Sequence, residues 1–395
     1  MLPGIVINFT NGNLGLQPAN ADGVLGLIAS GVAIDGKFAL NKAYTLYHLN
    51  DLDTLGVTMA NNAAVYKIVK EFYDNAADGT EVWLMAFPDT LLVSDIVDKT
   101  KNNAVSFINA ANGRLRGLLI SRTPDATYAP TITNGLDGDV ALALSNAEAL
   151  AVWATESKYA PIFVGIEGYA YGGDPTQLTD LHTLQFDHAF VFIGDTVVSS
   201  KNATMGTLAG AIATASVQTS VAAVKNGPIT SITAFIGAQP VELADVESIH
   251  NKGYISLRTF VGRSGYFFTD DPMATSATDD YRQLTYRRTI DKAYRIAYNT
   301  MLPLIKDSLP INSDGTIQYA YARAWEVEVE RAIVAQMTAN GELSADAQNG
   351  DDGVTVQVDT TVNVVSNPFA INVKVRPFGY ANLVDVSLGF QTISQ

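Results

Sequence analysis

Residues 31–38 (GVAIDGKF) have the glycine and lysine spacing of a phosphate-binding loop, G-x-x-x-x-G-K. In such a loop the next residue is Ser or Thr, whose hydroxyl coordinates magnesium, but here it is Phe38. A phosphate also needs the amides at the start of a helix, and the sequence that follows favours extended chain. We therefore interpret residues 31–38 as an ordinary glycine-containing loop.

Residues 74–85 (DNAADGTEVWLM) partly match a calcium-binding loop. Asp74, Asp78 and Gly79 stand at the expected positions, but Ala76 and Met85 replace two ligands. Too few oxygens remain to hold calcium, and a helix-to-strand turn explains the segment better. The acidic segment at residues 349–353 (NGDDG) is interpreted as a solvated turn.

Groups for acid–base or nucleophilic catalysis are not arranged in any familiar pattern. Residues 262–265 (GRSG) do not form the G-x-S-x-G turn, and no histidine can be assigned to Ser264. The four histidines lack the three- or four-residue spacing of metal ligands on one helix, and the chain contains no cysteine. We therefore expect no enzymatic activity, no metal and no cofactor.

The composition narrows the class of protein. The chain has 395 residues, a formal net charge of −15, 47% hydrophobic residues and only 16% charged residues. The hydrophobic fraction supports a large core, and the acidic balance argues against direct binding of nucleic acid. Residues 203–224 carry no charge, but their Ala, Gly, Ser and Thr content favours a buried helix, so no membrane insertion is expected. So few charges indicate that much of the surface is covered by partners.

Apolar runs of strand length alternate with helical patterns over residues 21–262. Strands are expected in GVLGLIASG, EVWLMAF, RLRGLLISR, PIFVGIEG, HAFVFIGD and SITAFIGA, with helices over 62–75, 93–111, 140–156 and the Ala-rich stretch. This alternation predicts an α/β body with a mostly parallel sheet covered by helices, possibly as two subdomains.

The last third predicts an α+β C-terminal assembly domain over residues 263–382. Two helices, 280–304 and 317–340, precede three alternating strands, of which the last includes Val384, Val386, Leu388 and Phe390. Residues 1–20 and 383–395 are expected to form β-prone N- and C-terminal arms. On the first helix, Arg288, Lys292 and Arg295 share one face. That face is either a solvated stripe offset by local acids, or a docking face for an acidic partner or a neighbouring copy.

Both ends of the chain favour edge strands. The N-terminal run with Ile5, Val6, Ile7 and Phe9 carries no charge, and an unpaired apolar edge normally invites aggregation. One interpretation is that each arm adds a strand to a sheet of a neighbouring copy, in a head-to-tail contact that builds rings or filaments. The alternative is pairing of the two ends within one chain.

The order of elements resembles that of the tail sheath proteins of contractile phages and related contractile injection systems. The resemblance is carried by the opening, PGIVINF, GVLGLIASG, YTLYHLNDLDTLGV and AVYKIVKEFYDNAADGTEVWLMAF, and by the close, YRRTIDKAYRIAY, AIVAQMTANGELSA, VTVQVD, INVKVRPF and LVDVSLGF. Together these segments cover the two outer thirds of the chain.

The resemblance implies a structural subunit that polymerises as stacked rings around an inner tube and contracts to drive the tube through a cell envelope. The implied partners are other copies of the chain, the inner tail tube protein, and baseplate and tail terminator proteins. The implied location is a virion tail assembled in the cytoplasm of a bacterial host. The tube would be gripped near the helix that ends at about Leu343, with Glu330 and Arg331 as candidates, whereas charge alone favours the Arg288 face.

Two other classes remain open from the residues themselves. One is an α/β enzyme with an added oligomerisation domain, which would need a cleft with convergent polar groups at the carboxyl ends of the strands. The other is a different self-assembling virion component, such as a tail tube or coat subunit, although a tube protein would usually be shorter and mostly β.

Overall fold

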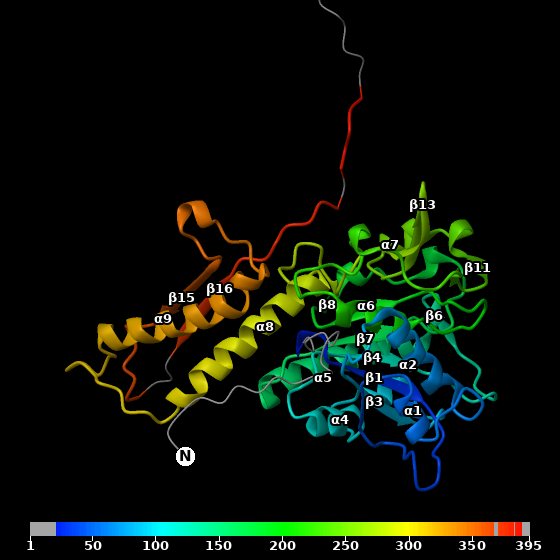
Figure 1. Ribbon diagram of the computed structural model, residues 1–395, viewed down its shortest axis with the longest axis horizontal. Helices are drawn as coiled ribbons and strands as arrows, with labels where there is room; N and C mark the ends of the chain where they lie inside the picture. The colour runs from blue at the N-terminus through cyan, green and yellow to red at the C-terminus, as the bar shows by residue number, and fades with distance from the viewer. Residues whose placement is uncertain (1–20, 367–369, 383, 389–395) are drawn as a thin grey trace, which may run out of the picture. The chain divides into compact units, whose positions relative to one another are not determined.

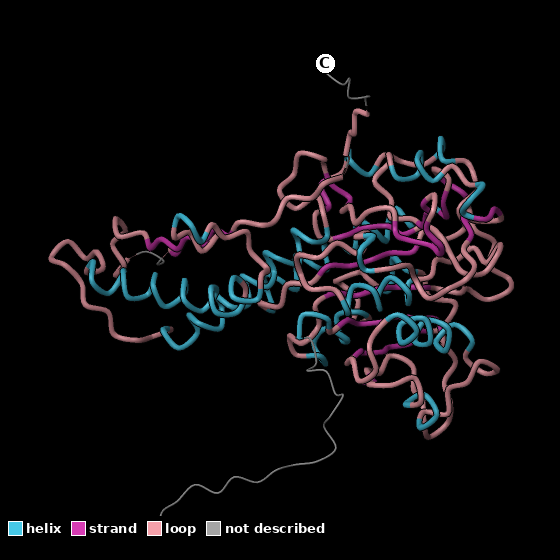
Figure 2. The backbone as a smooth tube through the Cα atoms, turned by 45° about the horizontal axis from the view of Figure 1, so that its top comes forward, coloured by secondary structure: helices cyan, strands magenta, loops and turns pink. Residues whose placement is uncertain are grey.

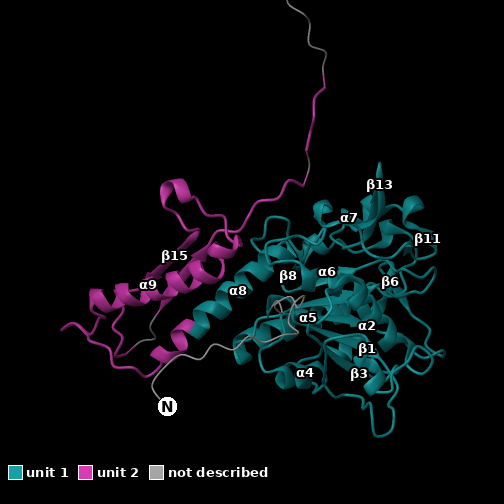
Figure 3. Ribbon diagram, in the orientation of Figure 1, with its two compact units in different colours: residues 1–299 teal, residues 300–395 magenta. Residues whose placement is uncertain are grey.

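The computed structural model describes residues 21–366, 370–382 and 384–388. The chain divides into two compact units, residues 1–299 and residues 300–395, which Figure 3 shows in different colours. The division falls later than the expected boundary after residue 262, because most of helix α8 (Leu284–Met301) belongs to the first unit.

The first unit is built on a six-stranded sheet in the order β2-β3-β1-β4-β7-β9 (Figure 1). Adjacent strands run parallel, except that β2 pairs antiparallel with β3 at one edge. Every residue of β1 and β9 is buried, as expected for strands covered on both faces. The strands are β1 (Leu25–Ser30), β2 (Tyr44–Leu46), β3 (Val82–Phe87), β4 (Gly117–Ser121), β7 (Phe163–Glu167) and β9 (Ala189–Phe192).

Helices alternate with these strands along the chain and lie around the sheet, as Figure 2 shows in cyan and magenta. The mostly parallel α/β body predicted from the alternation is confirmed. The helices of this unit, besides α8, are α1 (Asp51–Thr54), α2 (Ala63–Asn75), α3 (Val93–Ile96), α4 (Ala104–Ala111), α5 (Gly138–Lys158), α6 (Met205–Thr214) and α7 (Val246–His250).

Helices cover both faces of the sheet. Gly31, just after β1, faces Val65 of α2, whereas Gly26 within β1 faces Phe107 of α4. The two glycines are an odd number of residues apart, so they point to opposite faces, and α2 and α4 therefore lie on opposite sides. Each site is too tight for a larger residue, because a Cβ on Gly26 would lie 2.8 Å from the Phe107 ring.

Helices α2 and α6 cross at very short range through two glycines. A Cβ on Gly206 would lie 2.2 Å from the carbonyl oxygen of Ile68, and a Cβ on Gly210 would lie 2.5 Å from that of Phe72. Real Cβ atoms do not approach that closely, so the four-residue spacing of these glycines sets the helix contact. The small residues of this uncharged stretch therefore serve helix packing.

Three expected elements of the body differ from the structure. The helix predicted over 93–111 is interrupted between α3 and α4, where the Asp98 carboxylate accepts hydrogen bonds from the Thr100 amide at 2.8 Å and from its hydroxyl at 2.7 Å, which favours a turn. The Ala-rich helix ends at Thr214, and no helix among the described residues is long and apolar enough to span a bilayer. SITAFIGA supplies only β10 (Phe235–Ile236), which pairs with β11 (Gln239–Pro240) outside the main sheet.

Short antiparallel pairs complete the first unit. The longest joins β12 (Leu257–Phe260) to β13 (Arg263–Phe268) through a turn at Val261 and Gly262. The φ angle of Gly262 is 78°, a backbone conformation that favours glycine. The others pair β5 (Ile132–Thr133) with β6 (Leu136–Asp137), and β8 (Gln185–Phe186) with β14 (Ala274–Thr275).

The second unit contains helix α9 (Tyr319–Gln336) and the hairpin of β15 (Val354–Val358) and β16 (Ile371–Val375). Val354, Val356 and Val358 are buried, with Thr355 and Gln357 exposed between them, so the alternation predicted from sequence is confirmed for β15. Residues 384–388 form neither a helix nor a strand, so the third predicted strand is not formed over the described residues of this single chain.

Candidate functional site

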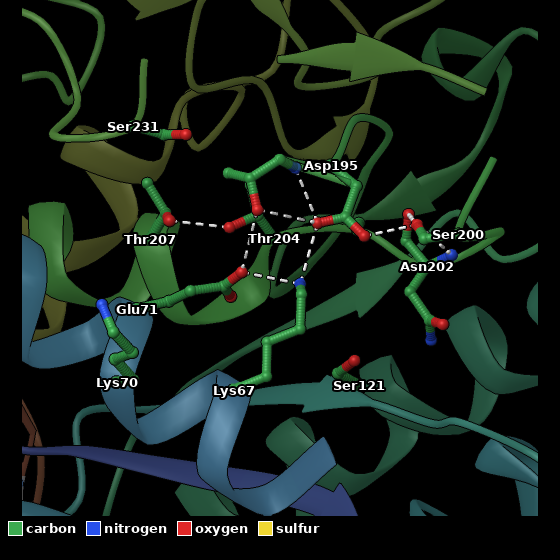
Figure 4. Close-up of polar contacts among 12 residues, drawn as sticks. Lys67, Lys70, Glu71, Ser121, Asp195, Ser200, Asn202, Thr204, Thr207 and Ser231 are labelled. Atoms are coloured by element: carbon green, nitrogen blue, oxygen red, sulfur yellow. Dashed lines mark hydrogen bonds and ion pairs between the residues drawn. The ribbon is translucent and has the colours of Figure 1, made fainter. Parts of the chain in front are cut away.

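A charged cluster lies beyond the carboxyl ends of the parallel strands, where an α/β enzyme would carry its reacting groups (Figure 4). Lys67 Nζ lies 2.6 Å from Glu71 Oε1 and 2.8 Å from Asp195 Oδ1, and the Ser200 hydroxyl donates to the Asp195 carboxylate. Burial lowers the pKa of Lys67, but the charges of Glu71 and Asp195 outweigh it and raise that pKa overall. The lysine is therefore a fixed cation.

Glu167, the last residue of β7, is fully buried beside this cluster. Its carboxylate accepts hydrogen bonds from the Ser121 hydroxyl at 2.9 Å, the Asn202 amide at 3.1 Å and the backbone N–H groups of Arg122 and Ala203. Burial raises the pKa of Glu167 to about 7, although these four donors oppose the shift. The residue joins the ends of β4 and β7 to the loop that leads into α6.

A small cavity adjoins the polar groups at the carboxyl ends of the strands. The adjoining cavity has a volume of about 130 Å³, and the described residues that line it include no histidine. Its charged groups are bonded to one another and join α2 to the loop after β9, so the polar groups at this end of the sheet already have partners within the chain.

A second ionic cluster joins Glu148 of α5 to Asp187 and His188. His188 Nδ1 lies 2.8 Å from Glu148 Oε1 and 2.6 Å from Asp187 Oδ1. Burial lowers the pKa of His188, but the two carboxylates raise it overall, to about 9. This donor set also has the composition of a metal site. In the structure these three side chains form an ionic cluster that connects α5 to the residues just before β9.

The basic residues of α8 point into the body, so the expected exposed docking face at Arg288, Lys292 and Arg295 is wrong. Arg288 is 3% exposed, and its guanidinium donates to the carbonyl oxygens of Ile212 at 3.1 Å and Ala215 at 2.8 Å. These carbonyls belong to the last turn of α6 and the residue after it, where a cation is favourable. The solvated stripe is excluded for the same reason.

Lys292 and Arg295, the other two cations of this face, form ion pairs with Asp22. Its carboxylate lies 2.7 Å from Lys292 Nζ and 3.5 Å from Arg295 Nη2. Burial raises the pKa of Asp22, but Lys292, Arg295 and Arg116 outweigh that effect and lower it overall. Helical spacing had shown that the cations share a face, but it cannot show whether the face meets solvent or a carboxylate more than 260 positions earlier in the chain.

In the second unit, the β15–β16 hairpin presents unpaired edges among the described residues. Asp359 N donates to Ala370 O and Arg376 N donates to Gly353 O, which fixes the alternation of the ladder between them. It follows that the N–H and C=O groups of Ile371, Val373 and Val375 point to the free edge of β16.

The edge of β15 is partly covered. The N–H of Val358 donates to Glu326 Oε1 of α9 at 2.9 Å, so this end of the strand already has a partner. The side chains of Ile371, Val373 and Val375 are half-buried, while Asn372 and Lys374 are exposed. The free edge of β16 is therefore a template for another strand that alternates apolar and polar side chains.

The remaining predicted site residues fall into three groups. Val384, Val386 and Leu388 are exposed and unpaired within the described chain, with Leu388 94% exposed. Glu330 and Arg331 lie on α9, half-buried and exposed respectively. Ile5, Val6, Ile7, Phe9 and Phe390 lie outside the described residues.

The fold is that of proteins from contractile sheaths. A chain of the baseplate of the anti-feeding prophage matches with a TM-score of 0.63 and 13% identity, over 99% of both chains. A chain of the contracted PVC sheath complex, an extracellular contractile injection system, matches with a TM-score of 0.60 and 14% identity, over 99% of this chain and 98% of the other. A sheath tail protein of Desulfitobacterium hafniense matches with a TM-score of 0.52 and 11% identity, over 90% and 94%.

The sequence itself places the chain in a family. The chain belongs to the DUF2586 family, whose N-terminal domain matches residues 2–272 and whose C-terminal domain matches residues 280–393. A search of the curated proteins gave no match. The resemblance to sheath proteins inferred from the outer thirds of the sequence is confirmed at the level of the fold.

Proposed function

We propose that this chain is the subunit of a contractile sheath, polymerising as stacked rings around an inner tube and contracting to drive the tube through a target envelope. The observation that carries the proposal is the free edge of β16, in a chain whose fold matches that of sheath proteins over nearly its whole length. Self-assembly also accounts for the low charged fraction of 16%.

The joints between copies are the arms. Val384, Val386 and Leu388 alternate with Asp385 and Ser387, so an extended arm has one apolar and one polar side. Such a strand suits the edge of β16, which offers Ile371, Val373 and Val375 on one face. Ile5, Val6, Ile7 and Phe9 are proposed as the matching N-terminal arm. Main-chain hydrogen bonds between copies hold while whole subunits move, which a contracting array requires.

The proposed partners beyond the chain itself are an inner tube protein, baseplate proteins and a tail terminator. The second unit is proposed to face the tube through α9, where Arg331 is exposed and Glu330 is half-buried. The proposed location is the tail of a virion or of a related particle, assembled in the cytoplasm of a bacterial host.

Electron microscopy of the purified chain tests this proposal. Negative-stain images of the full-length chain are expected to show hollow cylinders or rings. Removing residues 1–10 is expected to abolish them while the circular dichroism spectrum stays that of a folded protein. Truncation after residue 382 is expected to do the same. Normal cylinders from both truncated chains would overturn the arm mechanism.

A further inference from the structure

The tip of the β12–β13 hairpin combines positive charge with exposed apolar surface. Arg258 and Arg263 are exposed, Phe260 is half-buried and Val261 is fully exposed at the turn. We call these four residues the hairpin patch. Figure 1 shows β13 standing out from the rest of the first unit. The roles proposed above for the arms and for α9 do not involve the hairpin patch.

The two arginines have no carboxylate partner among the described residues. Arg263 forms no ion pair within the described residues, and the guanidinium of Arg258 lies over the ring of Phe260 at 4.2 Å. Glu242, which lines the same groove as Arg263, accepts a hydrogen bond from the Tyr266 hydroxyl at 2.8 Å. Other arginines in this chain, such as Arg114 and Arg376, are paired with carboxylates.

An open groove runs beside the patch. It has a volume of about 500 Å³ and lies between the loop at residues 228–232 and the strand at residues 263–266. Ile232 on its rim is 91% exposed. Register places Phe260 opposite Arg263, so cation and aromatic ring sit side by side at the base of the turn. The surface therefore offers two cations around an apolar centre, next to an open groove.

We propose that the hairpin patch binds an acidic surface of a neighbouring copy of this chain, as a lateral contact separate from the arms. Charge complementarity is the reason for this occupant: the chain carries a net charge of −15, so neighbouring copies repel unless opposite charges meet locally. Two arginines that form no ion pair within the described chain, around an apolar centre, can pair with acidic side chains of another copy. The proposal rests on the proposed self-assembly and adds a second, salt-sensitive contact to it.

The test compares three forms of the full-length chain by sedimentation velocity over a range of concentrations and salt. The first is the natural chain, and the second carries Arg258→Glu and Arg263→Glu. The control carries Lys37→Glu and Lys99→Glu, which change the charge equally at two exposed lysines without a described ion pair. Thermal melts are expected to be equal for all three, since each changed side chain is exposed.

The patch variant is expected to need at least about threefold more protein than the control for half-maximal association at low salt, because exposed charge pairs contribute modestly. The difference is expected to shrink above roughly 0.5 M salt as charges are screened. Val261→Ser is expected to weaken association to a similar degree at every salt concentration. Removal of residues 1–10 is expected to abolish cylinders at all salt concentrations, and this separates a failure of the arms from a failure of the patch.

Several outcomes would overturn the proposal. One is equal association of the patch variant and the control at low salt. Another is a natural chain that remains monomeric at every concentration. Binding of the patch to a different component of the particle, with self-association unchanged, would also reject a neighbouring copy as the occupant.

Discussion

Replacing Val373 by proline tests whether the free edge of β16 receives a strand from another copy. The alternation of the hairpin directs the Val373 N–H away from β15, so proline removes no hydrogen bond within the chain. Edge strands tolerate proline where the N–H faces outward. The folded subunit therefore loses only part of one half-buried side chain, at a cost of about 1 kcal/mol.

The cost to assembly is larger. An added strand would lose its central donor and keep an unpaired carbonyl, which costs about 1–3 kcal/mol. That range corresponds to a contact between copies that is weaker by about fivefold to about 150-fold. Because every copy in the proposed array would use the same contact, long cylinders are expected to be absent at concentrations where the natural chain is expected to form them.

Asn372→Pro is the matched control, because the Asn372 N–H points to Gln357 within the hairpin. It is expected to lower the melting temperature of the subunit, whereas Val373→Pro is expected to leave melting almost unchanged and block assembly. Assembly is measured by pelleting and electron microscopy, and folding by circular dichroism. Cylinders of normal length from the Val373→Pro chain would refute the assignment of this edge.

Three further predictions concern the first unit. The pKa of His188 is raised to about 9, so its contribution of up to about 3 kcal/mol is complete below the unfolded value near 6.5 and is lost as pH rises through about 9. The free energy of unfolding of His188→Gln, measured with denaturant, should therefore approach that of the natural chain above that pH. The free energy of unfolding of His48→Gln, at an exposed position, should equal that of the natural chain at every pH. A constant difference between His188→Gln and the natural chain at every pH would contradict the assignment. Gly206→Ala should cost about 1–3 kcal/mol, because its Cβ would meet the Ile68 carbonyl at 2.2 Å, whereas Gly172→Ala, with 3.8 Å to the nearest atom, should cost little. Arg288→Met should lower the melting temperature by several degrees, because it leaves carbonyl groups at the end of α6 without a hydrogen-bond donor, whereas Arg331→Met should not. Equal melting temperatures of the two variants would show that Arg288 is not held in the body.

The main sheet could be predicted because its strands are nearly continuous apolar runs separated by helices. β1, β3, β4, β7 and β9 all lie within the segments expected from sequence. The helix predicted over 93–111 is interrupted between α3 and α4 by the turn at Asp98, which a periodic apolar pattern does not reveal. β10 is apolar too, but its place outside the main sheet depends on tertiary pairing with β11.

The charged residues were harder to interpret from sequence. Helical spacing predicts that Arg288, Lys292 and Arg295 share one face, and the structure confirms this. Whether that face is exposed depends on Asp22 and on the end of α6, which spacing does not reveal. The sequence gives no signal for Glu167, because a glutamate at the end of an apolar strand is usually a surface residue. Only the fold shows that four donors converge on it. Sequence periodicity reports which residues share a side, and not what lies opposite.

The free edge of β16 also bears on how such proteins diverge. Backbone hydrogen bonds make no demand on side-chain identity, and the edge asks an incoming strand only for alternation of apolar and polar residues. A joint of this kind tolerates replacement of nearly every residue that forms it, provided that the pattern persists. Such an edge is therefore compatible with a fold that is kept at low sequence identity, and the solved structures that share this fold are 11–14% identical to this chain.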